Sequence, residues 1–155
     1  MNATLTRTLT VIGAVLVLAA INYSIYAKEQ IKRNGEVMYL QLAPVDPRSL
    51  MQGDYMALRF AVAGEIARQH TGGNSVSLQL DSQRVARMPE AGSAGALRVR
   101  YRMRNGQVWL GTNAYFFEEG SASRFTSARY GKFRVDPQSG EAVLVALCDA
   151  QLKEL

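Results

Sequence analysis

The chain begins with a long apolar segment and continues with shorter segments in which apolar and polar residues alternate. Residues 9–27 read LTVIGAVLVLAAINYSIYA, carry no charge and contain one strongly polar residue, Asn22. At about 1.5 Å per residue, a helix of this length covers a hydrocarbon core of roughly 30 Å. Tyr23 and Tyr26 fall at its end, where aromatic rings prefer the headgroup layer. We therefore predict a short N-terminus over residues 1–8 and a transmembrane helix over residues 9–27.

A cleaved signal peptide is the alternative interpretation of this segment, because Arg7 precedes the apolar run. Cleavage needs small side chains at the −3 and −1 positions. Before the two candidate cleavage points the −3 residues are Ile25 and Leu18, which are too large. We therefore expect a retained signal anchor, followed by a juxtamembrane linker over residues 28–35.

The charges that flank the helix leave its orientation open. Only Arg7 precedes the span, whereas Lys28, Lys32 and Arg33 follow it. A positive-inside count keeps the C-terminal domain in the cytoplasm, but the signal-like N-terminus favours the opposite side. The three basic residues after the helix also suit anionic headgroups on whichever side they emerge.

Residues 36–155 show mostly a period of two, which is typical of strands. We predict strands over residues 37–42, 55–60, 76–80 and 115–117, short helices over 61–70 and 121–129, and a loop over 89–96. A continuation of the second strand through Val62 is the alternative to the helix over 61–70. In the second of these strands Met56, Leu58 and Phe60 share one face. The expected fold class is mainly β, of the α+β type: an N-terminal transmembrane helix followed by a small antiparallel β domain with one or two short helices.

Two hairpins are expected in the C-terminal half. In the first, Asn105-Gly106 joins residues 97–104 to residues 107–111, and Asn-Gly is the preferred two-residue type I′ turn. Such a turn sets the cross-strand neighbours as Met103 with Val108, Arg102 with Trp109, and Tyr101 with Leu110. In the second hairpin, residues 137–140 join a strand over 130–136 to a strand over 141–149.

One face of the first hairpin carries four arginines, which are Arg98, Arg100, Arg102 and Arg104. Neighbouring residues on one strand face lie about 7 Å apart, so these like charges repel one another. A solvated outer face is the simplest interpretation. Acidic side chains from a neighbouring strand, stacking on Trp109, or an anionic ligand would each relieve the repulsion. The face is also a candidate docking surface for an acidic partner or for membrane headgroups.

The net charge of +5 does not indicate a nucleic-acid-binding protein. The chain has 18 Lys and Arg and 13 Asp and Glu, and setting aside the five charged residues up to Asn34 leaves 14 basic and 12 acidic ones. The domain is therefore nearly neutral, and it lacks a basic tail, a zinc pattern and a glycine-rich phosphate loop. We expect no nucleic-acid partner.

The sequence offers little for a metal or cofactor site. One histidine and one cysteine cannot build a transition-metal site, and a single cysteine excludes an intramolecular disulfide. The apolar neighbours of Cys148 predict a buried thiol in a strand. The acidic residues available for an oxygen-ligand site lack the spacing of an EF-hand loop; they are Asp46, Asp54, Glu118 and Glu119. We expect neither a metal nor a cofactor, and we expect the pair Glu118-Glu119 to cap a turn or to meet the arginine face.

The most informative motif lies in residues 44–60, and it resembles the signature of the GDYXXLXY family of small bacterial membrane-associated proteins. Four residues match this signature, namely Gly53, Asp54, Tyr55 and Leu58. Phe60 stands where the family has tyrosine, so the ring is kept and the hydroxyl is lost. The resemblance continues through residues 116–120, which include Glu119 and Gly120, and through residues 128–136. It implies a single-pass protein of the bacterial inner membrane with its domain outside the cytoplasm, and it implies no particular activity.

The signature has a structural and a functional interpretation. Gly53 permits a positive φ and Asp54 accepts backbone N–H groups, so together they can turn the chain into a strand. Arg48 is a candidate ion-pair partner of Asp54 or Asp46. In the functional interpretation, Arg48, Asp54 and Tyr55 form an exposed recognition patch at the end of the sheet.

An enzyme is the alternative class of function. Ser49 lies shortly before a Gly-Asp that opens a strand, a layout that weakly resembles type I signal peptidases. A serine nucleophile needs a base, which is a buried lysine in those peptidases. The bases available in the domain are His70, Lys132 and Lys153, and none is expected to be buried.

We therefore expect an extracytoplasmic module that is anchored in the lipid bilayer by its N-terminal helix and that binds or scaffolds a multi-pass membrane protein. Asn22 would offer that partner an interhelical hydrogen bond. A membrane-anchored hydrolase and a small-ligand-binding domain are the alternatives.

Overall fold

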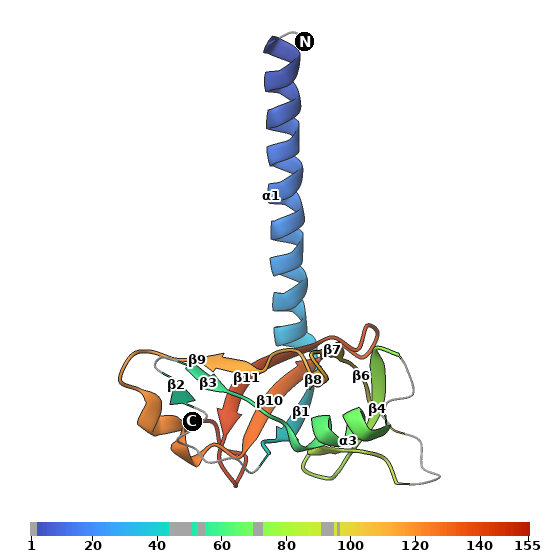
Figure 1. Cartoon of the computed structure of the whole chain (residues 1–155), viewed down its shortest axis with the longest axis vertical. Coiled ribbons are helices and arrows are strands. Elements are labelled where there is room, and N and C mark those ends of the chain that lie inside the picture. Colours follow the sequence, from blue (N-terminus) through green and yellow to red (C-terminus); the bar gives the residue numbers. More distant parts are fainter. Residues whose placement is uncertain (1–2, 44–50, 53–54, 70–72, 91–94, 96) are drawn as a thin grey trace.

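The structure is a computed structural model that describes residues 3–43, 51–52, 55–69, 73–90, 95 and 97–155. A long helix, α1 (Ala3–Asn34), stands on a small domain of short antiparallel strands (Figure 1). The predicted fold is confirmed. Helix and strand contents are about equal, because α1 alone contributes 32 residues.

Helix α1 is long and apolar enough to cross a membrane. Its most apolar window of 18 residues has a mean hydropathy of 2.0, and none of that window is buried against the domain. The helix does not stop at the expected linker but continues to Asn34. Pairs one turn apart support this extension, since Arg33 contacts Glu29 at 3.2 Å and Asn34 donates to Gln30 at 2.8 Å.

The helix is joined to the domain through its last turns. Ile31 is buried, and the backbone N–H of Gly35 donates to the Ile31 carbonyl at 2.8 Å, which closes the helix. A Cβ atom on Gly35 would lie 2.6 Å from that carbonyl oxygen and 3.0 Å from the backbone of Val135. Only glycine therefore fits where α1 turns into the first strand.

The central sheet has the order β1-β10-β11 and is antiparallel. Its strands are β1 (Glu36–Gln41), β10 (Tyr130–Val135) and β11 (Ala142–Cys148). The second predicted hairpin is confirmed by the β10–β11 pair, with a bulge between Lys132 and Phe133. Cys148 is fully buried at the end of β11, as expected.

Three smaller sheets complete the described strands. One has the order β2-β3-β9, with β2 (Met51–Gln52), β3 (Tyr55–Ala57) and β9 (Ala114–Phe116). The next has the order β5-β4-β6, with β5 (Ala86–Arg87), β4 (Ser75–Leu80) and β6 (Leu97–Arg100). The last pairs β7 (Arg102–Arg104) with β8 (Gln107–Trp109). The short strand β5 was not expected from the sequence.

The first hairpin differs from its prediction in one respect. The turn is as expected, with φ of 51° at Asn105 and 73° at Gly106, and Met103 faces Val108 while Arg102 faces Trp109. The strand nevertheless breaks at Tyr101, so the predicted pair with Leu110 does not form part of the ladder. Strand β6 pairs with β4 instead, and the backbone N–H of Tyr101 continues this pairing by donating to the Asn74 carbonyl at 2.9 Å.

We call β3 the signature strand, because it carries Tyr55 of the signature. The core lies between the central sheet, the signature strand and the helix α3 (Ala61–Gln69). The predicted shared face is confirmed, since Met56, Leu58 and Phe60 are all buried, although β3 itself ends at Ala57. The Phe60 ring meets Phe133 edge-on, with 5.3 Å between the ring centroids. A hydroxyl is therefore not needed at position 60 for this packing.

The two short helices are found close to their predicted places. The first, α3, ends at Gln69 and buries Val62 and Ile66. The second is the 3-10 helix η1 (Ala122–Ser127), which buries Phe125. The predicted loop over residues 89–96 lies largely outside the described residues.

Candidate functional site

The signature strand brings together two segments that are far apart in the sequence. Strand β3 pairs with β9 in a register that places Tyr55 opposite Phe116. Their ring centroids lie 5.7 Å apart, and the Phe116 side chain is 74% exposed. We call Tyr55 and Phe116 the signature patch. Four other candidates from the sequence lie outside the described residues, namely Arg48, Ser49, Gly53 and Asp54.

A second layer of rings supports the signature patch from below. Phe125 in η1 contacts Tyr115 at 5.3 Å and Phe117 at 5.2 Å between ring centroids. Phe125 is buried, so this layer holds η1 against β9 while Phe116 remains outside. The patch is therefore an exposed aromatic surface on a packed support.

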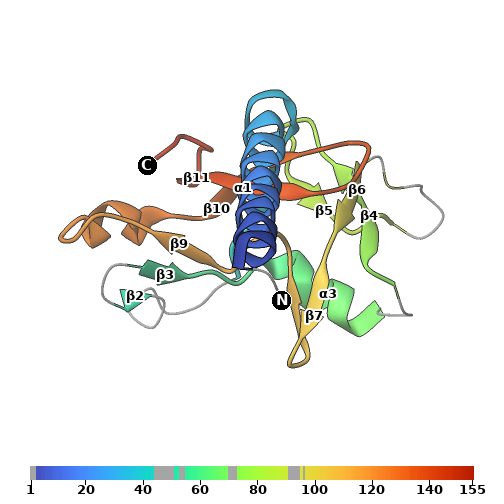
Figure 2. The same ribbon diagram turned by 90° about the horizontal axis from the view of Figure 1, so that it is seen from above.

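The acidic turn beside the patch, residues 118–121, is closed by hydrogen bonds to a backbone carbonyl. The carbonyl of Glu118 accepts the backbone N–H of Ser121 at 3.0 Å and its hydroxyl at 2.6 Å, and Gly120 has a φ of 80°. The side chains of Glu118 and Glu119 are exposed, and in the described part of the chain neither forms an ion pair with an arginine. Strands β3 and β9 lie on one side of α1, and β6 and β7 lie on the other (Figure 2). The glutamates therefore do not meet the arginine face.

Three of the four hairpin arginines line one cavity of about 580 Å³, which we call the arginine pocket. Its charged residues are Lys28 from α1, Arg100 from β6, Arg102 and Arg104 from β7, and Glu141 before β11. Trp109 from β8 forms part of the wall. Arg98 has its side chain on the same strand face as Arg100 but does not line the cavity.

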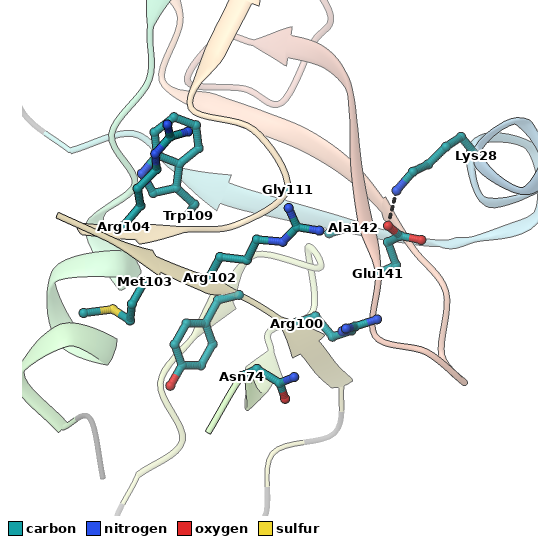
Figure 3. Close-up of a pocket in the computed structure, with 11 residues that line it drawn as sticks. Lys28, Asn74, Arg100, Arg102, Met103, Arg104, Trp109, Gly111, Glu141 and Ala142 are labelled. Carbon is teal, nitrogen blue, oxygen red and sulfur yellow. Dashed lines mark hydrogen bonds and ion pairs between the residues drawn. The ribbon is translucent and has the colours of Figure 1, made fainter. Parts of the chain in front are cut away.

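The pocket has an excess of positive charge. Its single carboxylate, Glu141, pairs with Lys28, and the guanidinium of Arg104 lies 5.8 Å from the Trp109 ring centroid. Within the described residues, no carboxylate pairs with Arg100 or Arg102. The side chains of both arginines, one from the end of β6 and one from the start of β7, point toward the Lys28–Glu141 pair (Figure 3). Stacking on Trp109, one of the three ways in which the repulsion among the arginines could be relieved, therefore acts only on Arg104.

The turn between β10 and β11 builds one edge of the pocket. The Asp136 carboxylate accepts the Ser139 hydroxyl at 2.6 Å and the Gln138 N–H at 3.1 Å, and these hydrogen bonds lower its pKa. The Gly140 carbonyl accepts the backbone N–H of Arg100 at 2.7 Å. The turn therefore positions both Glu141 and the backbone of Arg100.

A second, smaller cavity of about 290 Å³ lies between α3 and β8. Phe60, Ala63 and Val108 contribute apolar walls, and Asn113 also lines it. The Oδ1 atom of Asn113 is buried without a hydrogen-bond partner in the described residues. This cavity is the feature that keeps a small-ligand-binding domain open as an alternative.

The residues considered for catalysis do not form a site in the described structure. Ser49 and His70 lie outside the described residues. Lys132 is partly buried but donates to the Glu154 carboxylate at 2.6 Å, which raises its pKa and keeps it protonated. Burial raises the pKa of the Cys148 thiol. Among the described residues, no three His, Cys, Asp or Glu side chains lie together as a metal site would require.

Comparison with known proteins agrees with the resemblance seen in the sequence. No curated protein and no solved structure matches the chain. The model of the family described as "GDYXXLXY protein" matches residues 17–147, a stretch that includes the signature strand, the arginine pocket and nearly all of the central sheet. Because this match covers most of the chain, the protein belongs to the GDYXXLXY family.

Proposed function

We propose that the protein is a single-pass, membrane-anchored module that binds a multi-pass membrane protein through its signature patch. In this proposal α1 lies in the bacterial inner membrane and the domain lies on its extracytoplasmic side. The observation that carries the proposal is the contact between Tyr55 and Phe116. It joins the signature strand to residues 116–120, where the resemblance to the family continues, at an exposed aromatic surface.

The exposure of Phe116 supports a role in binding. Among the described residues after α1, only Met103 and Phe116 are large hydrophobic side chains with substantial exposure, and Phe116 is the more exposed of the two. Exposed aromatic side chains are enriched where proteins bind one another. Two short strands and a supporting ring layer hold Phe116 in a position where its side chain is mostly exposed and packs little against the core. A binding partner is the simplest explanation for this exposure.

The surface of α1 supports a partner within the membrane. Asn22 donates from its side-chain amide to the Leu18 carbonyl at 2.8 Å, which satisfies one donor inside the helix. Its Oδ1 atom is available as an acceptor for a donor on a neighbouring helix. The apolar side chains around it are exposed, as expected for a helix that faces lipid and other helices.

Site-specific photocrosslinking tests this function. A photoreactive phenylalanine analogue at position 116 is expected to capture one multi-pass membrane protein from intact membranes. The matched control carries the analogue at Gln83, an exposed position in the turn before β5, and is expected to capture nothing specific. Capture should be lost in Tyr55→Ala, which removes the neighbouring ring. Crosslinks only to a second copy of the chain, or equal capture from both positions, would contradict the proposal.

The hydrolase alternative is separated by one substitution. A serine hydrolase that uses Ser49 loses its activity in Ser49→Ala, whereas a binding module keeps its crosslink from position 116. The pairing of Lys132 with Glu154 argues against lysine as the base, because general-base catalysis needs a neutral amine.

A further inference from the structure

We infer that the arginine pocket binds the phosphate of an anionic phospholipid headgroup from the leaflet in which α1 ends. The inference rests on the membrane anchor of the proposed function and does not depend on the protein partner. It assigns a role to the arginines that the signature patch leaves unexplained.

The depth of the pocket is the first argument. The uncharged run of α1 ends at Ala27, and the next residue, Lys28, lines the pocket. A rise of about 1.5 Å per residue places Lys28 just beyond the hydrocarbon core. The polar layer on each side of that core is roughly 5–8 Å thick. Lys28 therefore lies within the headgroup layer, and the pocket that it lines lies beside this end of α1 (Figure 3).

The charge of the pocket is the second argument. Lys28 and Glu141 neutralise each other, which leaves three guanidinium groups around one cavity. Arg100 and Arg102 direct their side chains toward the same edge. A guanidinium presents two parallel N–H groups that match the oxygens of a phosphate, so a phosphodiester is well suited to bridge Arg100 and Arg102.

The composition of the wall is the third argument. Trp109 is partly exposed and lies under the guanidinium of Arg104. Tryptophan and arginine side chains both combine an apolar body with polar N–H groups, and they favour the boundary between lipid and water. Tyr23 and Tyr26 are exposed on α1 within two turns of Lys28 and suit the same layer.

The test uses the full chain in lipid nanodiscs and the fluorescence of Trp109, the single tryptophan of the protein. Phosphatidylglycerol is added in steps to discs of phosphatidylcholine. The Trp109 emission is expected to change and then saturate. Arg100→Gln with Arg102→Gln should raise the phosphatidylglycerol content needed for half the change by roughly 10- to 30-fold, since each basic residue near a membrane contributes about one kcal/mol.

The matched control is Arg98→Gln with Arg68→Gln, which removes the same charge from exposed positions outside the pocket. This variant is expected to titrate like the unmodified protein, and near-UV circular dichroism confirms that both double variants are folded. An equal loss in both double variants would mean diffuse charge attraction and would overturn the inference. No Trp109 response to phosphatidylglycerol would overturn it as well.

Further arms identify the source of the anion. Inorganic phosphate or glycerol phosphate, added to discs of phosphatidylcholine alone, should not reproduce the response. If either does so and competes with phosphatidylglycerol, the ligand is a soluble phosphate and not a lipid. If a glutamate-rich peptide saturates the response more readily than the lipid, the pocket binds an acidic protein segment. If the chain does not enter the discs, the membrane anchor itself is wrong, whereas insertion without a lipid response rejects only this inference.

Discussion

The Lys28 ammonium in α1 pairs with the Glu141 carboxylate before β11, and this contact joins the end of the apolar run to the central sheet. Ile31 and Gly35 add a packed junction one and two turns further along. The side chains of the pair are 48% and 37% exposed, so the pair contributes little to the free energy of unfolding. The pair adds a second point of contact between α1 and the domain, beside the packing at Ile31.

Breaking this pair should loosen the helix without unfolding the domain. We expect Lys28→Gln to change the free energy of unfolding by less than about 1 kcal/mol. The distance distribution between spin labels at Ser24→Cys and Gln151→Cys should broaden. Arg33→Gln is the control, because its partner Glu29 belongs to the same helix. Unchanged distances in Lys28→Gln would show that the junction at Ile31 and Gly35 is sufficient alone.

The junction glycine should tolerate no side chain. Gly35→Ala places a Cβ atom 2.6 Å from the Ile31 carbonyl oxygen, so we expect a loss of about 1–3 kcal/mol in urea unfolding followed by Trp109 fluorescence. Gly64→Ala in α3 meets no atom within 4 Å and should instead stabilise the domain by roughly 0.5–1 kcal/mol. Both substitutions add a single methyl group, and equal effects would contradict the close packing at Gly35.

Acid should weaken the turn that builds the pocket. Hydrogen bonds from the Ser139 hydroxyl and the Gln138 N–H hold the pKa of Asp136 below its usual value of 3.8. Because folding lowers this pKa, the stabilisation is complete above pH 3.8 and is lost as the pH falls through the pKa of the folded state. We expect Asp136→Asn to show a shallower loss of stability in acid than the unmodified protein. Ser139→Ala should lie between them. If stability falls equally with pH in all three proteins, Asp136 does not contribute to the acid sensitivity.

The single cysteine should be unreactive toward thiol reagents in the folded protein. Cys148 is fully buried, and burial raises the pKa of its thiol, so little reactive thiolate forms at neutral pH. We expect a maleimide reagent to modify it only after unfolding. Stoichiometric labelling of the native protein would contradict this burial.

Because Cys148 is expected not to react in the folded protein, a cysteine introduced on the surface can report on membrane topology. Gln107→Cys introduces an exposed thiol at the end of the β7–β8 hairpin. A membrane-impermeant maleimide should label it in intact spheroplasts when the domain lies outside the cytoplasm. Labelling that requires membrane disruption would place the domain in the cytoplasm, as a positive-inside count of Lys28, Lys32 and Arg33 suggests.

Several elements were predictable because their signals are local. The uncharged run over residues 9–27 predicts α1, the Asn105-Gly106 pair predicts the β7–β8 turn, and alternation predicts which residues of the signature strand are buried. Each signal depends on residues within a few positions of one another. The break at Tyr101 was not predictable, because it accompanies the pairing of β6 with the distant strand β4, which the Tyr101 N–H continues by donating to the Asn74 carbonyl.

The sequence by itself determined the long apolar helix, the antiparallel character of the domain and the family, since these follow from hydropathy, period and a contiguous motif. Only the tertiary structure decided which residues meet. It placed Phe116 beside Tyr55, gave Glu141 to Lys28, and separated Arg98 from the cavity that Arg100 lines. Such contacts depend on strand pairing between distant segments and on packing against α1, and neither is encoded in the spacing of neighbouring residues.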